Sequence, residues 1–307
     1  MIDVSIIYVN YKTAALVLDS LRSVRERTRG VTYEVIVVDN DSGDDSERLL
    51  REAFPEVRYR QAGANLGFGR ANNLGVEMAR GEFVFFLNPD TMLQNDAITA
   101  LVDFLRAHPE VGACGGNLTD GEGRPTFSLN RNDFTVAQEF LSIFYLRPPL
   151  WKAPRSHFYN FTGKPLRVRS IIGADLMVRK SVLDRIGAFD PAFFMNGEDI
   201  ELCHRIIRSG YAIYSVPDAR ITHLEGRAPY VKMSRLLLLY EGNYMLFYKL
   251  YSLAAARRLC RVIRMKCRLR YWLFLGLGNK RKQEYWREKG EVNERAWLNF
   301  EEKIKCL

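Results

Sequence analysis

Residues 83–91 read FVFFLNPDT, in which five apolar residues run directly into Asn88, Pro89 and Asp90. A short continuous apolar run of this kind predicts a strand that is buried on both faces. Because proline has no backbone N–H to donate, the strand cannot continue through Pro89 in the middle of a sheet. The sequence therefore places the carboxylate of Asp90 just beyond the end of a buried strand.

Strand and helix patterns alternate around this run. We expect three earlier strands at 4–9, 33–38 and 57–61, and helices at 13–27, 45–54, 68–79 and 95–107. This alternation predicts an α/β fold with a mostly parallel sheet and right-handed crossovers. Ligands bind outside the carboxyl ends of the strands in such sheets, and Asp39 and Asp90 both lie at such ends.

The second half of the chain has a less regular pattern. Residues 117–169 show weak periodicity, and we expect a loop-rich, substrate-specific insert there. The pattern then predicts a strand at 170–178, a short helix from 181, a helix at 198–210, strands at 211–216 and 219–222, and helices from 233 onward.

Composition argues against several classes of protein. The five cysteines, at 114, 203, 260, 267 and 306, form no C-x-x-C pair, so neither a zinc site nor a redox motif is indicated. Reduced thiols are typical of a cytosolic protein. The N-terminus enters a strand pattern at once and carries no signal-type apolar core. No uncharged apolar run reaches the roughly 18 residues of a membrane-spanning helix, so we expect a cytoplasmic location.

Positive charge is concentrated near the C-terminus. The chain has a net charge of +9, yet residues 251–290 alone hold twelve Lys or Arg and two Glu. Four arginines repeat at helical spacing, with leucines, a valine and an isoleucine on the other side: Arg257, Arg261, Arg264 and Arg268, against Leu259, Val262, Ile263, Leu269 and Leu273. This pattern fits a helix lying in an anionic membrane surface, and it also fits a helix packed on the catalytic domain with solvated arginines.

Two groups of residues could hold a nucleotide. Val9, Tyr11 and Asp39 end the first two strands, where an aromatic ring and a carboxylate can grip a base; the alternative is that Asp39 simply begins a turn. The stretch 65–73, NLGFGRANN, is a glycine-rich entry to a helix, where backbone N–H groups and Arg70 could face phosphate. Its glycines also fit a tight turn, and their place far from the first strand argues against a nicotinamide enzyme.

Acidic side chains suggest a metal site and a general base. Asp90, assisted by Asn88, suits Mg²⁺ or Mn²⁺ beside substrate phosphates, although an Asp after Pro also caps turns. Glu198 and Asp199 open a helix after an aromatic loop, where a carboxylate could act as general base or merely complement the helix dipole. His223 lies at the end of the last expected strand, and a lone histidine is more often not a metal ligand.

Taken together, the segments VSIIYVNY, VIVVDNDS, NLGFGRANN, GEFVFFLNPDT, GADLMVRKSVLDRIGAFDPAFFMNGEDIELCHRIIRSGY and ITHLEG resemble family-2 glycosyltransferases of the GT-A fold, most closely the rhamnosyltransferase-like branch. They cover most of residues 1–226 in family order. The resemblance implies a nucleotide-diphospho-sugar transferase with a Rossmann-like, mixed but mostly parallel sheet flanked by helices. It implies a catalytic domain at 1–230, divided into a donor half at 1–116 and an acceptor half at 117–230, and a helical C-terminal region at 231–307.

The resemblance also implies roles for single residues. Val9, Tyr11 and Asp39 would hold the base, and Arg70 and Asn72 would lie near the diphosphate or sugar. Asp90 matches the last acid of the family's Asp-x-Asp metal motif, and His223 matches a further metal ligand of some members. Asp199 matches the catalytic base, with Glu198 beside it. Asn88 replaces the first acid of the metal motif, which removes one anionic ligand.

The resulting hypothesis is an inverting glycosyltransferase with Mg²⁺ or Mn²⁺ as cofactor. It would move a sugar, rhamnose from dTDP-rhamnose, to a glycan or polyprenyl-linked saccharide in bacterial cell-surface polysaccharide synthesis. We expect it to be peripheral on the inner face of the cell membrane and to bind no nucleic acid. The alternatives are a sugar-phosphate nucleotidyltransferase, which should carry a glycine-rich loop after the first strand, and a non-catalytic protein that binds nucleic acid or membrane.

Overall fold

The computed structural model describes residues 2–133, 135–143, 158–224 and 232–306. They form two compact units. The first comprises Met1–Asn132, Arg155–Pro191 and Glu198–Pro229, and the second comprises Asp133–Pro154, Ala192–Gly197 and Tyr230–Leu307. Two segments of the second unit, 133–154 and 192–197, thus interrupt the first unit in the sequence.

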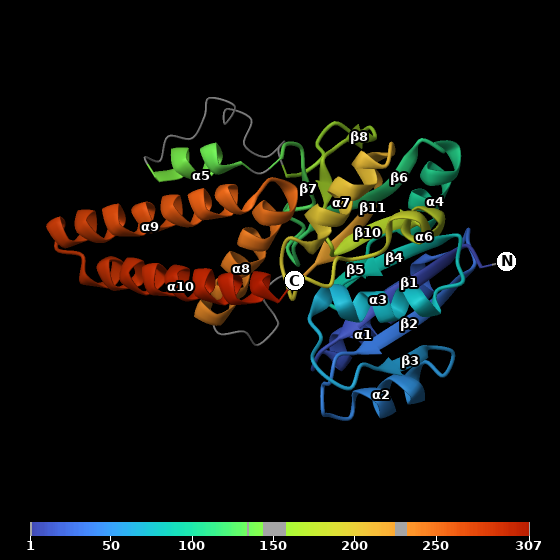
Figure 1. The fold of residues 1–307 in the computed structure, drawn as a ribbon. Coiled ribbons are helices and arrows are strands. Elements are labelled where there is room, and N and C mark those ends of the chain that lie inside the picture. The colour runs from blue at the N-terminus through green and yellow to red at the C-terminus, as the bar shows by residue number, and fades with distance from the viewer. Residues whose placement is uncertain (1, 134, 144–157, 225–231, 307) are drawn as a thin grey trace. The chain divides into compact units, whose positions relative to one another are not determined.

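Among the described residues, the first unit contains a sheet of nine strands (Figure 1). They are β1 (Val4–Asn10), β2 (Tyr33–Asp39), β3 (Arg58–Gln61), β4 (Phe83–Leu87), β5 (Thr91–Leu93), β6 (Val111–Thr119), β8 (Leu166–Arg167), β10 (Asp175–Arg179) and β11 (Ala212–His223). The order is β3-β2-β1-β4-β10-β6-β11-β5, and β8 pairs with β11. Strands β1–β4 run parallel, β10 is antiparallel to both of its neighbours, and β6 is parallel to β11. The sheet is therefore mixed, as expected.

Helices cover both faces of this sheet (Figure 1). One face packs on α1 (Ala14–Arg27), α2 (Ser46–Ala53) and α4 (Ala97–Ala107), and the other on α3 (Phe68–Met78), α6 (Lys180–Ile186) and α7 (Glu198–Arg208). Strand β4 contributes to both cores, because Phe83, Phe85 and Leu87 point to the first face and Val84 and Phe86 to the second. Its burial on both faces confirms the prediction made from FVFFL.

Three predictions for the second half of the sheet were wrong. Strand β6 was missed, because Gly112, Gly115 and Gly116 lower its strand propensity. The sheet needs these glycines: a Cβ on Gly115 would lie 2.3 Å from the Ile171 side chain. The strand expected at 170–178 is broken into β9 (Ser170–Ile171) and β10, and β9 pairs with β7 (Leu129–Asn130) in a separate small sheet.

The third correction concerns the end of the sheet, where two strands were expected. The structure has one continuous strand, β11, whose register against β6 shifts between Ser215 and Arg220. The shift spans Pro217 and Asp218, the two residues that separated the expected strands. Of the expected loop-rich insert at 117–169, residues 144–157 lie outside the described part of the chain.

The second unit is helical. It comprises α5 (Val136–Ile143), α8 (Lys232–Leu250), α9 (Leu253–Gly276) and α10 (Lys280–Lys305). Its core is aromatic: Tyr244 packs on Trp297 and Phe300, and its hydroxyl donates to the buried Asn293. In the described residues, no helix is both long and apolar enough to cross a membrane.

Candidate functional site

The ends of β1 and β2 are joined by a buried polar network. Asn10 donates from Nδ2 to Asp39 Oδ2 at 2.6 Å and to Ser42 Oγ at 3.1 Å, and the Ser42 N–H donates to Asp39 Oδ1 at 2.8 Å. Asp39 is fully buried, and Val9 and Tyr11 are half-buried on either side of Asn10. Sequence reasoning missed Asn10, although a polar residue closing an apolar strand was a signal.

A second link ties β2 to the start of α3. Asn40 accepts from the Leu66 N–H at 2.8 Å and donates to the Gly67 carbonyl at 3.3 Å. Gly67 has φ +82°, a backbone conformation that favours glycine and turns the chain into the helix. The motifs VIVVDNDS (35–42) and NLGFGRANN (65–73), which 22 residues separate in sequence, therefore meet at one edge of the sheet.

The polar side chains of α3 bind backbone carbonyls of this chain. Arg70 is exposed and donates from Nε to the Pro191 carbonyl at 2.7 Å, while the buried Asn72 donates to the Phe68 carbonyl at 3.1 Å. Asn73 both donates to the Phe189 carbonyl, at 2.8 Å, and accepts from its N–H, at 2.9 Å. These bonds hold the segment that leads toward α7, and the expected roles of Arg70 and Asn72 toward a diphosphate stay predictions.

The two acids at the start of α7 lie against the start of α3. Asp199 Oδ2 accepts from the Gly173 N–H at 2.9 Å. A Cβ placed on Gly173 would lie 3.2 Å from the Phe68 ring, and one placed on Gly69 would lie 3.8 Å from the Cβ of Glu198. Glycines at these positions thus allow the helix starts and the 172–174 turn to approach closely.

The metal motif adjoins the same turn. The Asn88 N–H donates to the Ala174 carbonyl at 3.0 Å, one residue beyond the partner of Asp199. Asp90 Oδ1 lies 3.3 Å from His223 Nε2, and both side chains are largely buried, with 19% and 10% exposed. Pairing of β5 with β11 brings these two residues together. The structure therefore gathers the ends of β2 and β4, Asp199 and the Asp90–His223 pair along one edge of the sheet.

The Asp90–His223 pair fits a divalent cation that is shared with a substrate. A carboxylate oxygen is a ligand that Mn²⁺ prefers, and an imidazole nitrogen, although it suits Mn²⁺ less, is tolerated. No cluster of three or more His, Cys, Asp or Glu side chains suited to a metal occurs within the described ranges. A cation held by two protein ligands would complete its shell with water and phosphate oxygens.

Burial sets the electrostatics at the start of α7. Glu198 is buried, and its Oε2 has no hydrogen-bond partner in the described part of the chain. Burial, followed by the charge of Asp199, raises the pKa of Glu198 to about 8. Burial also raises the pKa of Asp199, against the bonds from the Gly173 and Ile200 N–H groups. A raised pKa makes a carboxylate a stronger base, which suits proton abstraction.

Arg205 fixes α7 to the preceding turn and was also missed from the sequence. Its Nε donates to Glu201 at 2.8 Å, and its terminal nitrogens donate to the carbonyls of Ile186, Gly187 and Ala188. The Glu201–Arg205 spacing of four residues on one helix face was the available signal.

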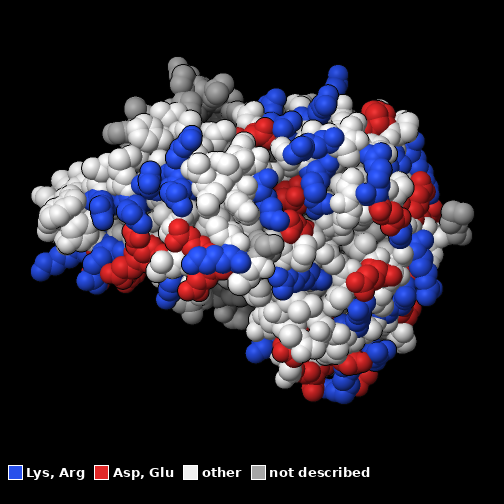
Figure 2. Space-filling view, viewed as in Figure 1, with Lys and Arg blue, Asp and Glu red and all other residues white. Residues whose placement is uncertain are grey.

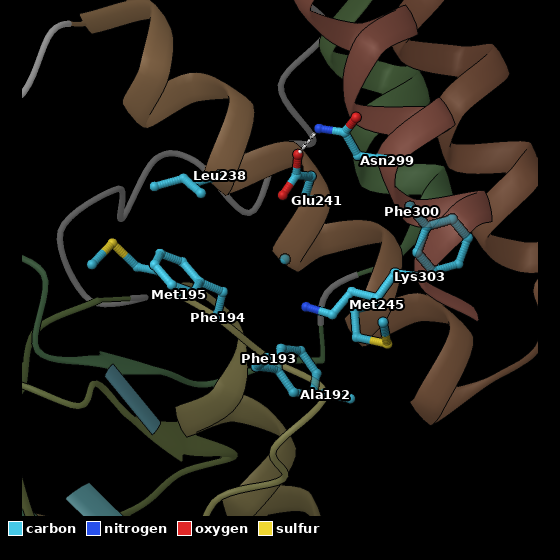
Figure 3. A pocket seen from close by; sticks show the side chains of 11 residues that line it. Ala192, Phe193, Phe194, Met195, Leu238, Glu241, Met245, Asn299, Phe300 and Lys303 are labelled. Carbon is cyan, nitrogen blue, oxygen red and sulfur yellow. Dashed lines mark hydrogen bonds between the residues drawn. The ribbon is translucent and has the colours of Figure 1, made fainter. Parts of the chain in front are cut away.

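In the second unit, the segment 192–197 packs on α8 and α10 around a small pocket (Figure 3). Phe193, Phe194 and Met195 line this pocket together with Leu238, Met245 and Phe300, and Asn299 donates to Glu241 beside them. Gly242 of α8 lies directly against the segment, since a Cβ there would be 2.2 Å from the Asn196 carbonyl oxygen. This segment immediately precedes Glu198 in the chain.

Comparison with known proteins gives a consistent family. The profile of the family described as "Glycosyl transferase family 2" matches residues 5–187. An N-acetylglucosaminyl-diphospho-decaprenol L-rhamnosyltransferase of Mycobacterium tuberculosis is 32% identical over 206 residues, which cover 62% of this chain and 66% of that protein. The match therefore spans just under two thirds of that relative. The rhamnosyltransferase WbbL of Escherichia coli is 25% identical over 198 residues, 62% of this chain and 72% of that protein.

A solved structure confirms the fold expected from the sequence. The mannosyltransferase PcManGT of Pyrobaculum calidifontis, in complex with GDP-Man and Mn²⁺, superposes with a TM-score of 0.57 at 16% identity, covering 97% of this chain and 86% of that one. At this identity the likeness establishes the GT-A type of fold alone.

Proposed function

The chain belongs to glycosyl transferase family 2, and from this premise we propose that it is an inverting glycosyltransferase using a nucleotide-diphospho-sugar donor. The observation that carries the proposal is the gathering of Asp199 and the Asp90–His223 pair at one sheet edge, linked through Gly173 and Ala174. Ligands bind at this edge in α/β sheets.

The donor would be held by residues 1–116. The base would lie over Val9 and Tyr11, with Asp39 preorganised by Asn10 as its hydrogen-bond partner. Arg70, Asn72 and Asn88 would face the diphosphate and sugar once the donor is bound. Residues 117–230 would supply the acceptor side.

Asp90 and His223 would hold Mg²⁺ or Mn²⁺. A divalent cation there would stabilise the negative charge that develops on the departing diphosphate. Support comes from the close approach of the two side chains, 3.3 Å, and from the Mn²⁺ in the structure of the Pyrobaculum calidifontis mannosyltransferase.

Asp199 would act as the catalytic base. An acceptor hydroxyl attacks the anomeric carbon from the side opposite the diphosphate, the bond to the diphosphate oxygen breaks, and the hydroxyl proton passes to Asp199. One displacement inverts the anomeric centre. The raised pKa of Asp199 favours this role. Glu198, beside Asp199, adds no negative charge to the region as long as the Glu198 carboxyl stays protonated.

The sugar would be rhamnose, from dTDP-rhamnose, and the acceptor a polyprenyl-linked saccharide for cell-surface polysaccharide. The two rhamnosyltransferase relatives support this choice. An acceptor on a lipid carrier would place the enzyme at the cytoplasmic face of the membrane, with the basic segment 251–290 toward anionic lipid.

The test is the Asp199→Asn variant. Its amide oxygen can still accept from the Gly173 N–H, so donor binding with Mn²⁺, measured by calorimetry, should match that of the wild type. Transfer of rhamnose to a synthetic diphospho-lipid disaccharide should fall by about 100-fold or more, because the base is lost. Transfer at nearly the wild-type rate would refute the assignment.

A further inference from the structure

The exposed face of α9 changes character along its length. Its first half carries the exposed Arg257, Arg258 and Arg261. Its second half exposes Met265, Leu269, Trp272 and Leu273, with 38%, 47%, 64% and 47% of each residue exposed. Steps of four, three and one residues place these four side chains on one helix face. Leu275 and Leu277, at the turn into α10, are exposed as well.

The leucines and the isoleucine that the sequence placed on one side of this helix thus fall into two groups, one buried and one exposed. Leu259 and Ile263, which the sequence pattern placed on the same apolar face as Leu269 and Leu273, are buried in the second unit's own core. Arg264, assigned to the headgroup face, is bound to Glu294. Within α9, whose residues are all described, the exposed large apolar side chains lie in the second half.

Basic residues surround this apolar end. Arg268 lies among its side chains, and Lys280, Arg281 and Lys282 follow the turn, all of them exposed. No Asp or Glu occurs between Glu241 and Glu284. Figure 2 shows white atoms at the end where α9 meets α10, with Lys and Arg on either side of them.

We propose that this hairpin end, residues 265–282, inserts into the interface of a membrane that contains anionic lipid. Met265, Leu269, Trp272, Leu273 and Leu277 would enter the boundary between headgroups and acyl chains, and the surrounding lysines and arginines would bind lipid phosphates. This proposal names the residues that would make the membrane contact of the proposed function. It rests on the proposed function only for the reason why the protein would bind a membrane.

The chemistry favours lipid over other occupants. A second copy of this chain bound at the same place would bring the exposed lysines and arginines of the two copies close together, and these would repel each other. Nucleic acid would bind the positive charges but would leave the exposed leucines in contact with water. Tryptophan at the level of lipid headgroups is typical of interfacial anchors. An anionic bilayer satisfies the apolar side chains and the charges at once.

The experiment is flotation of the full-length protein with vesicles, in about 0.1 M salt. Vesicles of phosphatidylcholine are compared with vesicles containing phosphatidylglycerol. We expect binding to the anionic vesicles only. The double variant Trp272→Ser, Leu273→Ser should lower this binding by about tenfold or more, because most of the inserted apolar area is lost. The matched control, Leu239→Ser with Leu298→Ser, removes exposed leucines elsewhere in the unit and should bind as the wild type does.

Several results would overturn the proposal. They are wild-type protein that does not float with anionic vesicles, a tip variant that binds as well as the wild type, and equal binding to duplex DNA of the same charge concentration. Thermal unfolding of each variant establishes that it is folded. Transfer to a water-soluble acceptor should be unaffected by the tip variant, so loss of vesicle binding and failure of the proposed enzymatic function are distinguishable.

Discussion

Replacing Glu198 with glutamine should change how stability depends on pH. Burial, followed by the charge of Asp199, raises the pKa of Glu198 from 4.5 to about 8. A carboxyl with a higher pKa in the folded protein than in the unfolded chain binds its proton more tightly when folded. The free energy of unfolding therefore falls as the pH rises from about 4.5 to 8.

The magnitude follows from this rise in pKa. Each pH unit is worth about 1.4 kcal/mol, so ionising Glu198 in the folded protein costs about 5 kcal/mol once the pH exceeds 8. Glutamine has nearly the same shape and does not titrate. We expect the Glu198→Gln variant to be as stable as the wild type near pH 5, and more stable by several kcal/mol near pH 9.

Urea unfolding, followed by circular dichroism near pH 5, 7 and 9, measures the difference. Glu201→Gln is the matched control, because Glu201 is equally buried on the same helix but pairs with Arg205 at 2.8 Å. Its loss should destabilise the protein at pH 7 and at pH 9. A gap between wild type and Glu198→Gln that stays constant across this range would refute the reasoning.

Three other substitutions test the geometry. Asp90→Asn should remove the dependence of donor affinity on Mn²⁺, measured by calorimetry with and without the ion; unchanged dependence would place the cation elsewhere. Gly242→Ala should lower stability by about 1–3 kcal/mol in urea unfolding, because its Cβ would overlap the Asn196 carbonyl, whereas Gly276→Ala, with nothing within 4 Å, should not. Arg205→Met should lower the free energy of unfolding by about 3–5 kcal/mol, because it leaves the buried carboxylate of Glu201 unpaired. A smaller loss in urea unfolding would mean that other contacts compensate for this ion pair and hold the turn at 186–188.

The sequence predicted best where physical signals are local. The run FVFFL is apolar without a break and stops at proline, so both the buried strand β4 and the position of Asp90 after it could be read directly. Strand β6 could not be predicted in this way. Its glycines are required by close packing against Ile171 and Ala219, which are more than fifty residues away in the chain.

The same distinction holds for the candidate site. Asp39, Asp90 and Asp199 stand in short motifs and could be named from the sequence. The hydrogen bonds that hold the site together join residues far apart in the chain, and these could not be predicted. Asn73 binds Phe189 across 116 residues, and no local pattern indicates that contact. The pairing of Asp90 with His223, 133 residues later, could be expected only through the family resemblance.

The packing of Gly242 against the 195–196 carbonyls has a consequence for the architecture. The loop that ends at Glu198 rests on helices that come from the far end of the chain. A protein truncated after residue 230 would lack the helices on which this loop packs. Every side chain proposed to bind or react with substrate would still be present. Swapping the C-terminal helices for those of a distant relative would therefore remove the packing partners of residues 192–197, the segment that leads into Glu198.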